Sequence, residues 1–233
     1  MTIKHPLYLV NENLFVRKHK EYFIVEKTLK NRRKKKISVP TENISYIVKF
    51  GNIDLDYSIF SYCSDNKIII YFFTKYGKYF GCFMPVAGQS KIKEYQYRFN
   101  SKEKLPFGKI EEIIKPTTWK ESVTQFSSHL FEVKIHSLLY QFELEPSYGF
   151  MNKDLAFDFL SLIEKEIKSF VAHVNVAQYK LFFIVKEDMV FLSEEGKMYI
   201  EKKFTEWLIN NTDFEINLKN KIIKFTNIIR NDD

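Results

Sequence analysis

The hydrophobic pattern changes along the chain from a strand-like to a helix-like spacing, and the change falls near residue 86. Before it, short β-prone runs such as residues 14–18 and 22–28 are separated by Asn-rich turns, which is typical of hairpins. After it, apolar residues recur at helical intervals, most clearly over residues 123–142. The pattern therefore predicts an α+β protein, with a β domain over residues 1–86 and a mainly α-helical domain over residues 87–233.

Individual elements can also be predicted on both sides of this boundary. In the β domain, residues 54–65 have the spacing of a helix, and the continuous apolar run over residues 67–73 is typical of a buried strand. The elements expected in the second domain are helices over 91–98, 160–174 and 194–208, a hairpin over 181–192, and a basic helix or tail from residue 217.

Composition narrows the class of protein. The 233 residues include 23 Phe and 14 Tyr but only 7 Gly, which indicates a folded, aromatic-rich chain. A net charge of +7 favours a polyanionic partner. Cys63 and Cys82 are too few for a disulfide framework and are interpreted as small core residues. Because no window has the length and hydropathy of a secretory signal or a membrane span, we expect a soluble, cytoplasmic protein with no membrane partner.

Basic residues are concentrated in two places. Five are consecutive, and side chains of neighbouring strand residues leave opposite faces, so we expect this run in an exposed turn. It is either a solvated hairpin tip or a finger that grips DNA phosphates. A second group lies on the polar helix expected over residues 91–98. The candidate DNA-binding residues are Arg32, Arg33, Lys34, Lys35, Lys36, Lys91, Lys93 and Arg98.

Several short motifs keep a common order and spacing over most of the chain. They are residues 37–48 with Gly51, 66–81 with Pro85, 96–98, 144–150, 155–160 and 190–197. In this order they resemble the CRISPR-associated integrase that acts in spacer acquisition. The resemblance implies a β-sandwich-like N-terminal domain and a helical, integrase-like C-terminal domain with a metal-dependent active site. It also implies dimerisation through the β domain.

The metal ligands implied by the resemblance are a glutamate early in the helical domain, a histidine after a Gly-Phe turn, and an acidic residue one turn beyond an aspartate. Here Asn152 stands at the histidine position and Ser161 at the acidic position, while Asp158 matches the aspartate. The central region is shorter than in the resembling family, and Glu111 is the only candidate for the position of the glutamate. Mg²⁺ and Mn²⁺ prefer charged oxygen ligands, which a neutral amide and a hydroxyl replace poorly.

Two further sets of residues are candidates for a metal site at a position other than the one that the resemblance implies. Asp154 and Asp158 lie close in sequence to Glu164 and Glu166, although we expect the two glutamates to face solvent. His129 and His136 share one helical face, and Glu132 lies one turn from each. For this second set the expected structure is a polar helix flank, and a cryptic metal site is the alternative.

We therefore expect a compact, catalytically impaired relative of the integrase that binds double-stranded DNA and scaffolds the integration complex. No cofactor is expected unless a site remains active, in which case it is Mg²⁺ or Mn²⁺. The resemblance implies as partners a second copy of the chain or a catalytic paralogue, together with a small ferredoxin-like adaptation subunit. The alternatives are an active minimal metal-dependent integrase or endonuclease, and a protein-binding regulator that retains only the fold.

Overall fold

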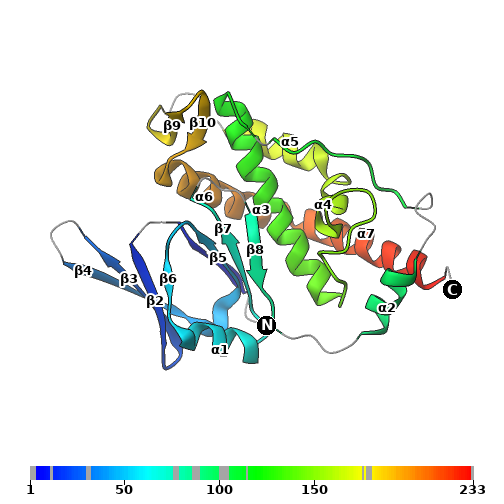
Figure 1. Ribbon diagram of the computed structural model, residues 1–233, viewed down its shortest axis with the longest axis horizontal. Helices are drawn as coiled ribbons and strands as arrows, with labels where there is room; N and C mark the ends of the chain where they lie inside the picture. Colours follow the sequence, from blue (N-terminus) through cyan, green and yellow to red (C-terminus); the bar gives the residue numbers. More distant parts are fainter. Residues whose placement is uncertain are drawn as a thin grey trace. The chain divides into compact units, whose positions relative to one another are not determined.

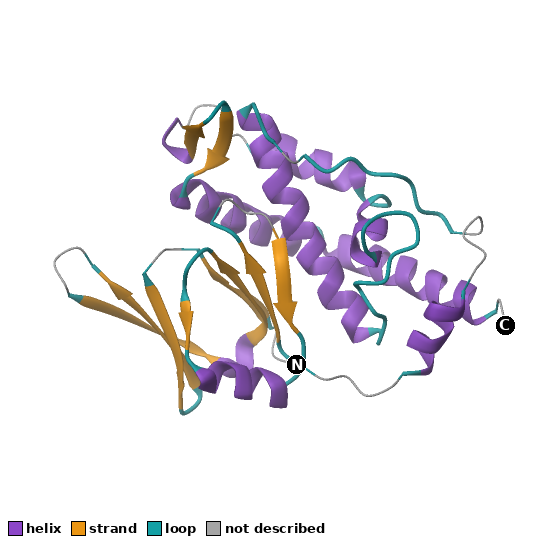
Figure 2. Ribbon diagram, in the orientation of Figure 1, coloured by secondary structure: helices purple, strands orange, loops and turns teal. Residues whose placement is uncertain are grey.

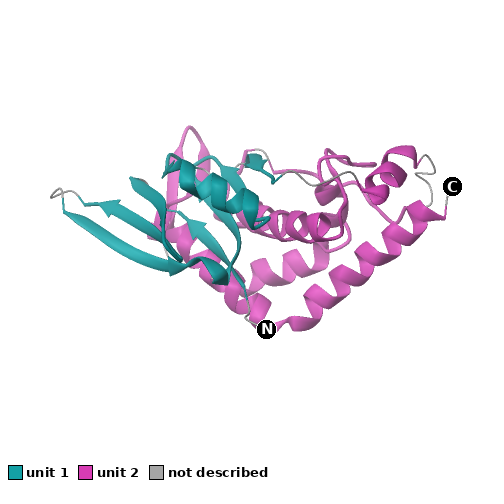
Figure 3. Ribbon diagram, turned by 90° about the horizontal axis from the view of Figure 1, so that it is seen from below, with its two compact units in different colours: residues 1–86 teal, residues 87–233 magenta. Residues whose placement is uncertain are grey.

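The computed structural model describes residues 4–10, 13–29, 33–75, 79–85, 90–99, 105–113, 115–174, 176 and 180–231. The chain divides into two compact units, residues 1–86 and residues 87–233, which are coloured separately in Figure 3. Strands make up most of the first unit and helices most of the second, so the protein is an α+β protein (Figure 2).

The first unit contains two four-stranded sheets (Figure 1). One has the order β1-β5-β7-β8, formed by His5–Leu9, Ile44–Phe50, Ile69–Phe73 and Tyr79–Phe83. The other has the order β4-β3-β2-β6, formed by Lys34–Pro40, Tyr22–Thr28, Leu14–His19 and Asp54–Leu55. The β2–β3 and β3–β4 pairs are antiparallel, as expected for consecutive hairpins.

The two sheets and one helix share a single hydrophobic core. Val16 and Phe23 come from one sheet, Ile47 and Ile70 come from the other, and Ile59 comes from α1 (Tyr57–Asp65). All five are fully buried or nearly so. Two sheets that pack apolar side chains into a common core form the arrangement of a β-sandwich, which the resemblance predicted.

Three of the consecutive basic residues, Lys34, Lys35 and Lys36, do not lie in a turn, so the expectation was wrong for them. Lys34, Lys35 and Lys36 begin strand β4 and extend its pairing with β3, where Lys36 lies opposite Glu26. Glu26 lies 3.7 Å from the Nζ of Lys34 and 3.2 Å from that of Lys36, so one carboxylate offsets part of their repulsion. Arg32 lies outside the described residues.

The second unit is built around helix α3. Its helices are α2 (Lys91–Arg98), α3 (Trp119–Gln141), α4 (Leu155–Leu160), α5 (Glu164–His173), α6 (Glu194–Asn210) and α7 (Thr212–Arg230), with the 3-10 helix η3 (Lys180–Phe182) and the hairpin β9–β10 (Phe183–Lys186 and Met189–Leu192). Helix α3 contacts α4, α5, α6, α7 and β10. It is the central helix of this unit.

Two expected boundaries in this unit differ from the structure. The helix expected over residues 160–174 is α5, which begins only at Glu164, and the preceding residues Leu155–Leu160 form a separate helix, α4. The C-terminal helix α7 begins at Thr212, five residues before the expected start. Among the described residues, no helix has the length and apolar character needed to span a bilayer.

Candidate functional site

Helix α3 carries polar side chains inside the second unit. The exposed fractions of His129, Glu132 and His136 are 3%, 1% and 5%. The expectation that the two histidines occupy a polar flank was therefore wrong, because helices cover α3 on the side where a solvent-facing stripe was predicted. A buried carboxylate or imidazole is costly unless it has hydrogen bonds or ionic partners, so this region requires a chemical explanation.

Asp158 stands at the matching position of the resemblance, and its carboxylate holds the preceding turn. The side chain is fully buried in α4. Its Oδ2 accepts a hydrogen bond from the backbone N–H of Phe150 at 2.6 Å, and its Oδ1 accepts those of Met151 at 3.1 Å and Asn152 at 2.7 Å. Three consecutive backbone donors on one carboxylate replace the water that it lost on folding.

Asn152 and Ser161 attach a second segment to this turn. Asn152 donates from Nδ2 to the carbonyl oxygen of Gly108 at 3.0 Å and to Oδ1 of Asp158 at 2.9 Å. Its Oδ1 accepts the backbone N–H of Ile110 at 3.2 Å. The hydroxyl of Ser161 accepts the N–H of Gly108 at 3.0 Å and donates to the carbonyl oxygen of Asp158 at 2.6 Å. We call Asn152, Asp158 and Ser161 the turn clamp.

The turn clamp does not fit a metal ion. Asn152 and Ser161 offer neutral oxygens that already accept backbone N–H groups, and both oxygens of Asp158 also accept them. A divalent ion would have to replace those donors and would gain only one charged ligand. The three predicted positions do lie together, but their interactions join segments of the chain.

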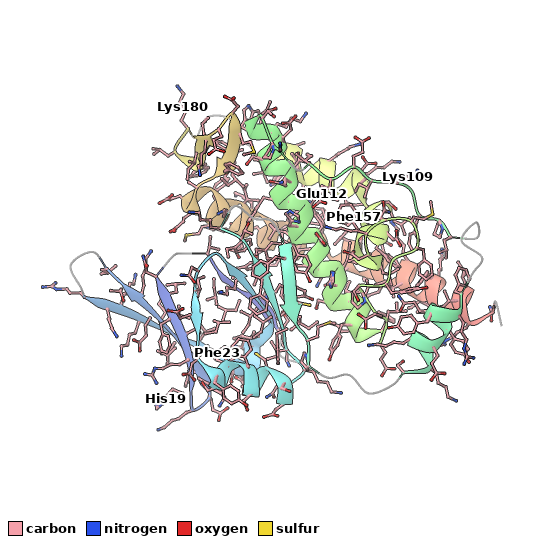
Figure 4. All side chains as sticks on the ribbon, in the orientation of Figure 1. His19, Phe23, Lys109, Glu112, Phe157 and Lys180 are labelled. Atoms are coloured by element: carbon pink, nitrogen blue, oxygen red, sulfur yellow. The ribbon has the colours of Figure 1, made fainter. Side chains whose placement is uncertain are left out.

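Glu111, the fourth predicted position, lies elsewhere. It is exposed and lines a cavity of about 190 Å³ together with Glu112, Glu164 and His129. Glu112 and Phe157, both labelled in Figure 4, are also part of its wall. Asp158 is not among the residues that line this cavity. Glu111 and Asp158 therefore do not line this cavity together.

A different group of side chains has the composition of a metal site. One ligand atom from each of Glu132, His136 and Asp154 lies within 4.8 Å of the others. Glu132 and His136 are four residues apart on α3, so their side chains lie on one face of the helix. Asp154 precedes α4 as its N-cap, and its Oδ1 accepts the N–H of Phe157 at 2.7 Å. We call these residues the buried triad.

Charges around the buried triad are partly balanced. Burial raises the pKa of Glu132, but the hydrogen bond from His129 at 3.1 Å and the positive charge of Lys153 outweigh it, so the net pKa is lowered. Burial lowers the pKa of His136 to about 4, which keeps its imidazole neutral at pH 7. Burial, followed by the nearby Glu132 carboxylate, raises the pKa of Asp154 to about 6.

Sequence reasoning found only part of this triad. The spacing of Glu132 and His136 was visible in the helical pattern, and a carboxylate was recognised as necessary beside the histidines. Asp154 was considered only with Asp158 and the glutamates of α5. No local pattern places a residue of the 152–158 turn against the middle of α3.

The candidate DNA-binding residues of α2 differ from one another. Lys91 and Arg98 are exposed, whereas Lys93 lies 3.1 Å from a carboxylate oxygen of Glu145 and its side chain is only 21% exposed. Gln96 is fully buried, and its side-chain Nε2 donates hydrogen bonds to the carbonyl oxygens of Glu145 and Tyr148. Helix α2 therefore uses Lys93 and Gln96 to hold the 145–148 segment.

Two comparisons relate this chain to one family. Residues 7–117, just under half of the chain, match the sequence model of the family described as "CRISPR associated protein Cas1". A Cas1 protein from Thermotoga maritima has the same fold, with a TM-score of 0.75 and 17% identity over 96% of each chain. The chain is similar to the Cas1 family, in sequence over residues 7–117 and in fold over nearly its whole length.

Two further proteins define the extent of the similarity. The chain is 28% identical over 123 residues to the "CRISPR-associated endonuclease Cas1 2" of Thermodesulfovibrio yellowstonii, which covers 48% of this chain and 36% of that protein. The chain thus matches only about a third of that relative's length. A casposase bound to its integration product shares the fold with a TM-score of 0.72 and 12% identity, over 88% of this chain and 83% of its own.

The family match ends before the turn clamp. It stops at residue 117, so residues 144–161 are related to the Cas1 family by the fold and by the short motifs rather than by that match. The chemistry at Asn152, Asp158 and Ser161 therefore has to be judged from their own contacts.

Gly149 precedes the clamped turn and can be tested by substitution. A Cβ atom at this position would lie 2.6 Å from the carbonyl carbon of Asp154, a backbone atom that has no side-chain freedom to move away. We expect Gly149→Ala to lower the free energy of unfolding by roughly 1–3 kcal/mol in urea denaturation. Gly81→Ala is the control, because no heavy atom lies within 4 Å of its Cβ position, and equal losses in both variants would contradict the steric argument.

The turn clamp predicts a structural role for the carboxylate of Asp158. In Asp158→Asn, an NH₂ group replaces one acceptor and faces backbone N–H groups. We expect the free energy of unfolding to fall by roughly 2–4 kcal/mol, measured by urea denaturation. Glu111→Gln, a change at an exposed carboxylate, should alter it by less than about 0.5 kcal/mol. An Asp158→Asn protein as stable as the unaltered chain would show that the clamp is dispensable.

Proposed function

We propose that this Cas1-like protein binds double-stranded DNA during CRISPR adaptation and scaffolds the integration complex, without metal chemistry at the positions that match the family's motif. The observation that carries the proposal is the turn clamp. Its oxygens accept hydrogen bonds from backbone N–H groups, and it contains one carboxylate where a divalent ion needs several charged ligands.

The DNA-binding part of the proposal is supported by the charge on strand β4. Lys34 and Lys36 have side chains 61% and 56% exposed on one face, and Arg17 lies beside them at 3.5 Å from Glu26. Glu26 is the shared partner of all three cations, so this face keeps a positive balance. Lys35 leaves the opposite face of the same exposed strand. Such residues can neutralise phosphates and release their counterions.

The partners follow from similarity to the family and remain part of the proposal. The resemblance implies a dimer through the first unit, with a second copy or a catalytic paralogue, and a small ferredoxin-like adaptation subunit. A companion subunit that performs the chemistry would let this chain serve as a scaffold and DNA clamp. A cytoplasmic setting is consistent with this role.

Neutralising the basic strand tests the DNA-binding proposal. We expect a variant with Gln at Arg33, Lys34, Lys35 and Lys36 to bind duplex DNA about tenfold more weakly in low salt, because fewer phosphates are neutralised. The slope of log affinity against log salt should become shallower by about 2. Fluorescence anisotropy with a labelled duplex, repeated over a salt series, measures both quantities.

The matched control removes the same number of charges from exposed positions of the second unit, at Lys165, Lys186, Lys202 and Lys224. It should keep most of the affinity. An equal loss in both variants would contradict the assignment to β4. If the unaltered protein has no measurable affinity for DNA in low salt, the protein-binding regulator becomes the better description.

An active minimal integrase or endonuclease is the second candidate, favoured by the cavity that Glu111, Glu112 and Glu164 line beside His129. Our proposal instead predicts no cleavage or joining of branched or linear DNA above background with Mg²⁺ or Mn²⁺, measured by gel electrophoresis. Metal-dependent product that disappears in Glu111→Gln would overturn it. The exposed Glu111 is the informative position, because loss of product in an Asp158 variant could result from unfolding of the clamp.

A further inference from the structure

The buried triad differs from the turn clamp in the chemistry of its side chains. We propose that Glu132, His136 and Asp154 bind one divalent transition-metal ion such as Mn²⁺ or Zn²⁺. Two carboxylates and one imidazole form a mixed oxygen and nitrogen set, which suits these ions better than Mg²⁺ or Ca²⁺. The ligand atoms lie within 4.8 Å of one another. An ion bound through metal–ligand bonds of about 2.1 Å would therefore draw the three side chains closer together.

The positions of the three donors are set by separate parts of the fold. Glu132 and His136 are held by the central helix α3. The cap at the start of α4 orients Asp154, since its Oδ1 accepts the N–H of Phe157 at 2.7 Å while the carboxylate keeps a second oxygen. The hydrogen bond from His129 to Oε2 of Glu132 at 3.1 Å orients the other carboxylate. Supporting hydrogen bonds of this kind position metal ligands.

Lys153 is the competitor of the ion in this proposal. Its Nζ lies 3.5 Å from Oε1 of Glu132, where it supplies positive charge to a buried carboxylate. The same Nζ lies 3.5 Å from Oε1 of Glu112 and 4.2 Å from the centre of the Phe157 ring. The side chain is 38% exposed, so it can move toward Glu112 when an ion takes its place at Glu132.

A cavity lies beside residues that contact the triad or Lys153. The cavity of about 190 Å³ is lined by His129, which is hydrogen-bonded to Glu132, and by Glu112 and Phe157, which contact Lys153. The acidic residues on this wall attract a cation toward the position that Lys153 occupies. The proposed ion would thus enter from the side that carries Glu111 and Glu112.

The proposed site is independent of the DNA-binding proposal. It uses none of Asn152, Asp158 and Ser161, and it requires no reaction on DNA. A protein that binds the ion but fails to bind DNA would overturn the proposed function alone. A protein that binds DNA but no ion would overturn the site alone.

The test is a titration of the chelator-treated full chain with Mn²⁺, followed by electron paramagnetic resonance of the free ion. We expect one ion per chain, with affinity reduced at least tenfold in Asp154→Asn and in His136→Gln. Asn is a good N-cap, so Asp154→Asn preserves the start of α4, and circular dichroism checks that each variant is folded. Absence of binding, or equal binding by the unaltered protein and a folded Asp154→Asn protein, would overturn the proposal.

Lys153→Gln provides a test in the opposite direction. Removing the competing charge should tighten Mn²⁺ binding severalfold, whereas loss of an ordinary structural ion pair would leave Mn²⁺ affinity unchanged. Saturating Mn²⁺ should also raise the melting temperature of the unaltered chain but not that of Asp154→Asn. Glu111→Gln is the control and should bind Mn²⁺ like the unaltered protein. An unchanged affinity in Lys153→Gln would contradict placement of the ion against Glu132.

Discussion

The carboxylate of Asp158 organises the functional region of the second unit. It accepts the N–H groups of Phe150, Met151 and Asn152, and thereby fixes the turn that leads into α4. Through the hydrogen bonds of Asn152, the same turn also holds the loop that contains Gly108 and Ile110. Because the carboxylate is fully buried, its hydrogen bonds are costly to lose, and the positions of the neighbouring side chains depend on it.

The turn also determines where Lys153 and Asp154 lie. Both follow directly after the clamped residues, and the structure places them against Glu132 in the middle of α3. The region where the sequence resemblance implies a metal site thus contains two adjacent arrangements. The turn clamp uses its oxygens to join backbone segments, whereas the buried triad gathers two carboxylates and an imidazole with one competing ammonium group. These arrangements assign different chemistry to residues only a few positions apart.

The two compact units contribute different properties to the proposed DNA scaffold. The first provides exposed cations on β4, which act at the surface and depend on salt. The second contains polar groups that act inside the protein, where fewer water molecules screen them. Similarity to the Cas1 family concerns the fold and residues 7–117, but the activity at each position depends on the side chains of this chain.

The sequence by itself determined the α+β class, the hairpins around residues 14–28 and the presence of the central helix, because strand and helix periods are local properties of the chain. It also indicated that Asn152 and Ser161 are poor metal ligands, since their chemistry is independent of the fold. Only the tertiary structure decided that the Asp158 carboxylate holds backbone N–H groups and that Asp154 meets Glu132 and His136. The physical reason is that burial and long-range contacts, which no local spacing encodes, select the partner of each polar group.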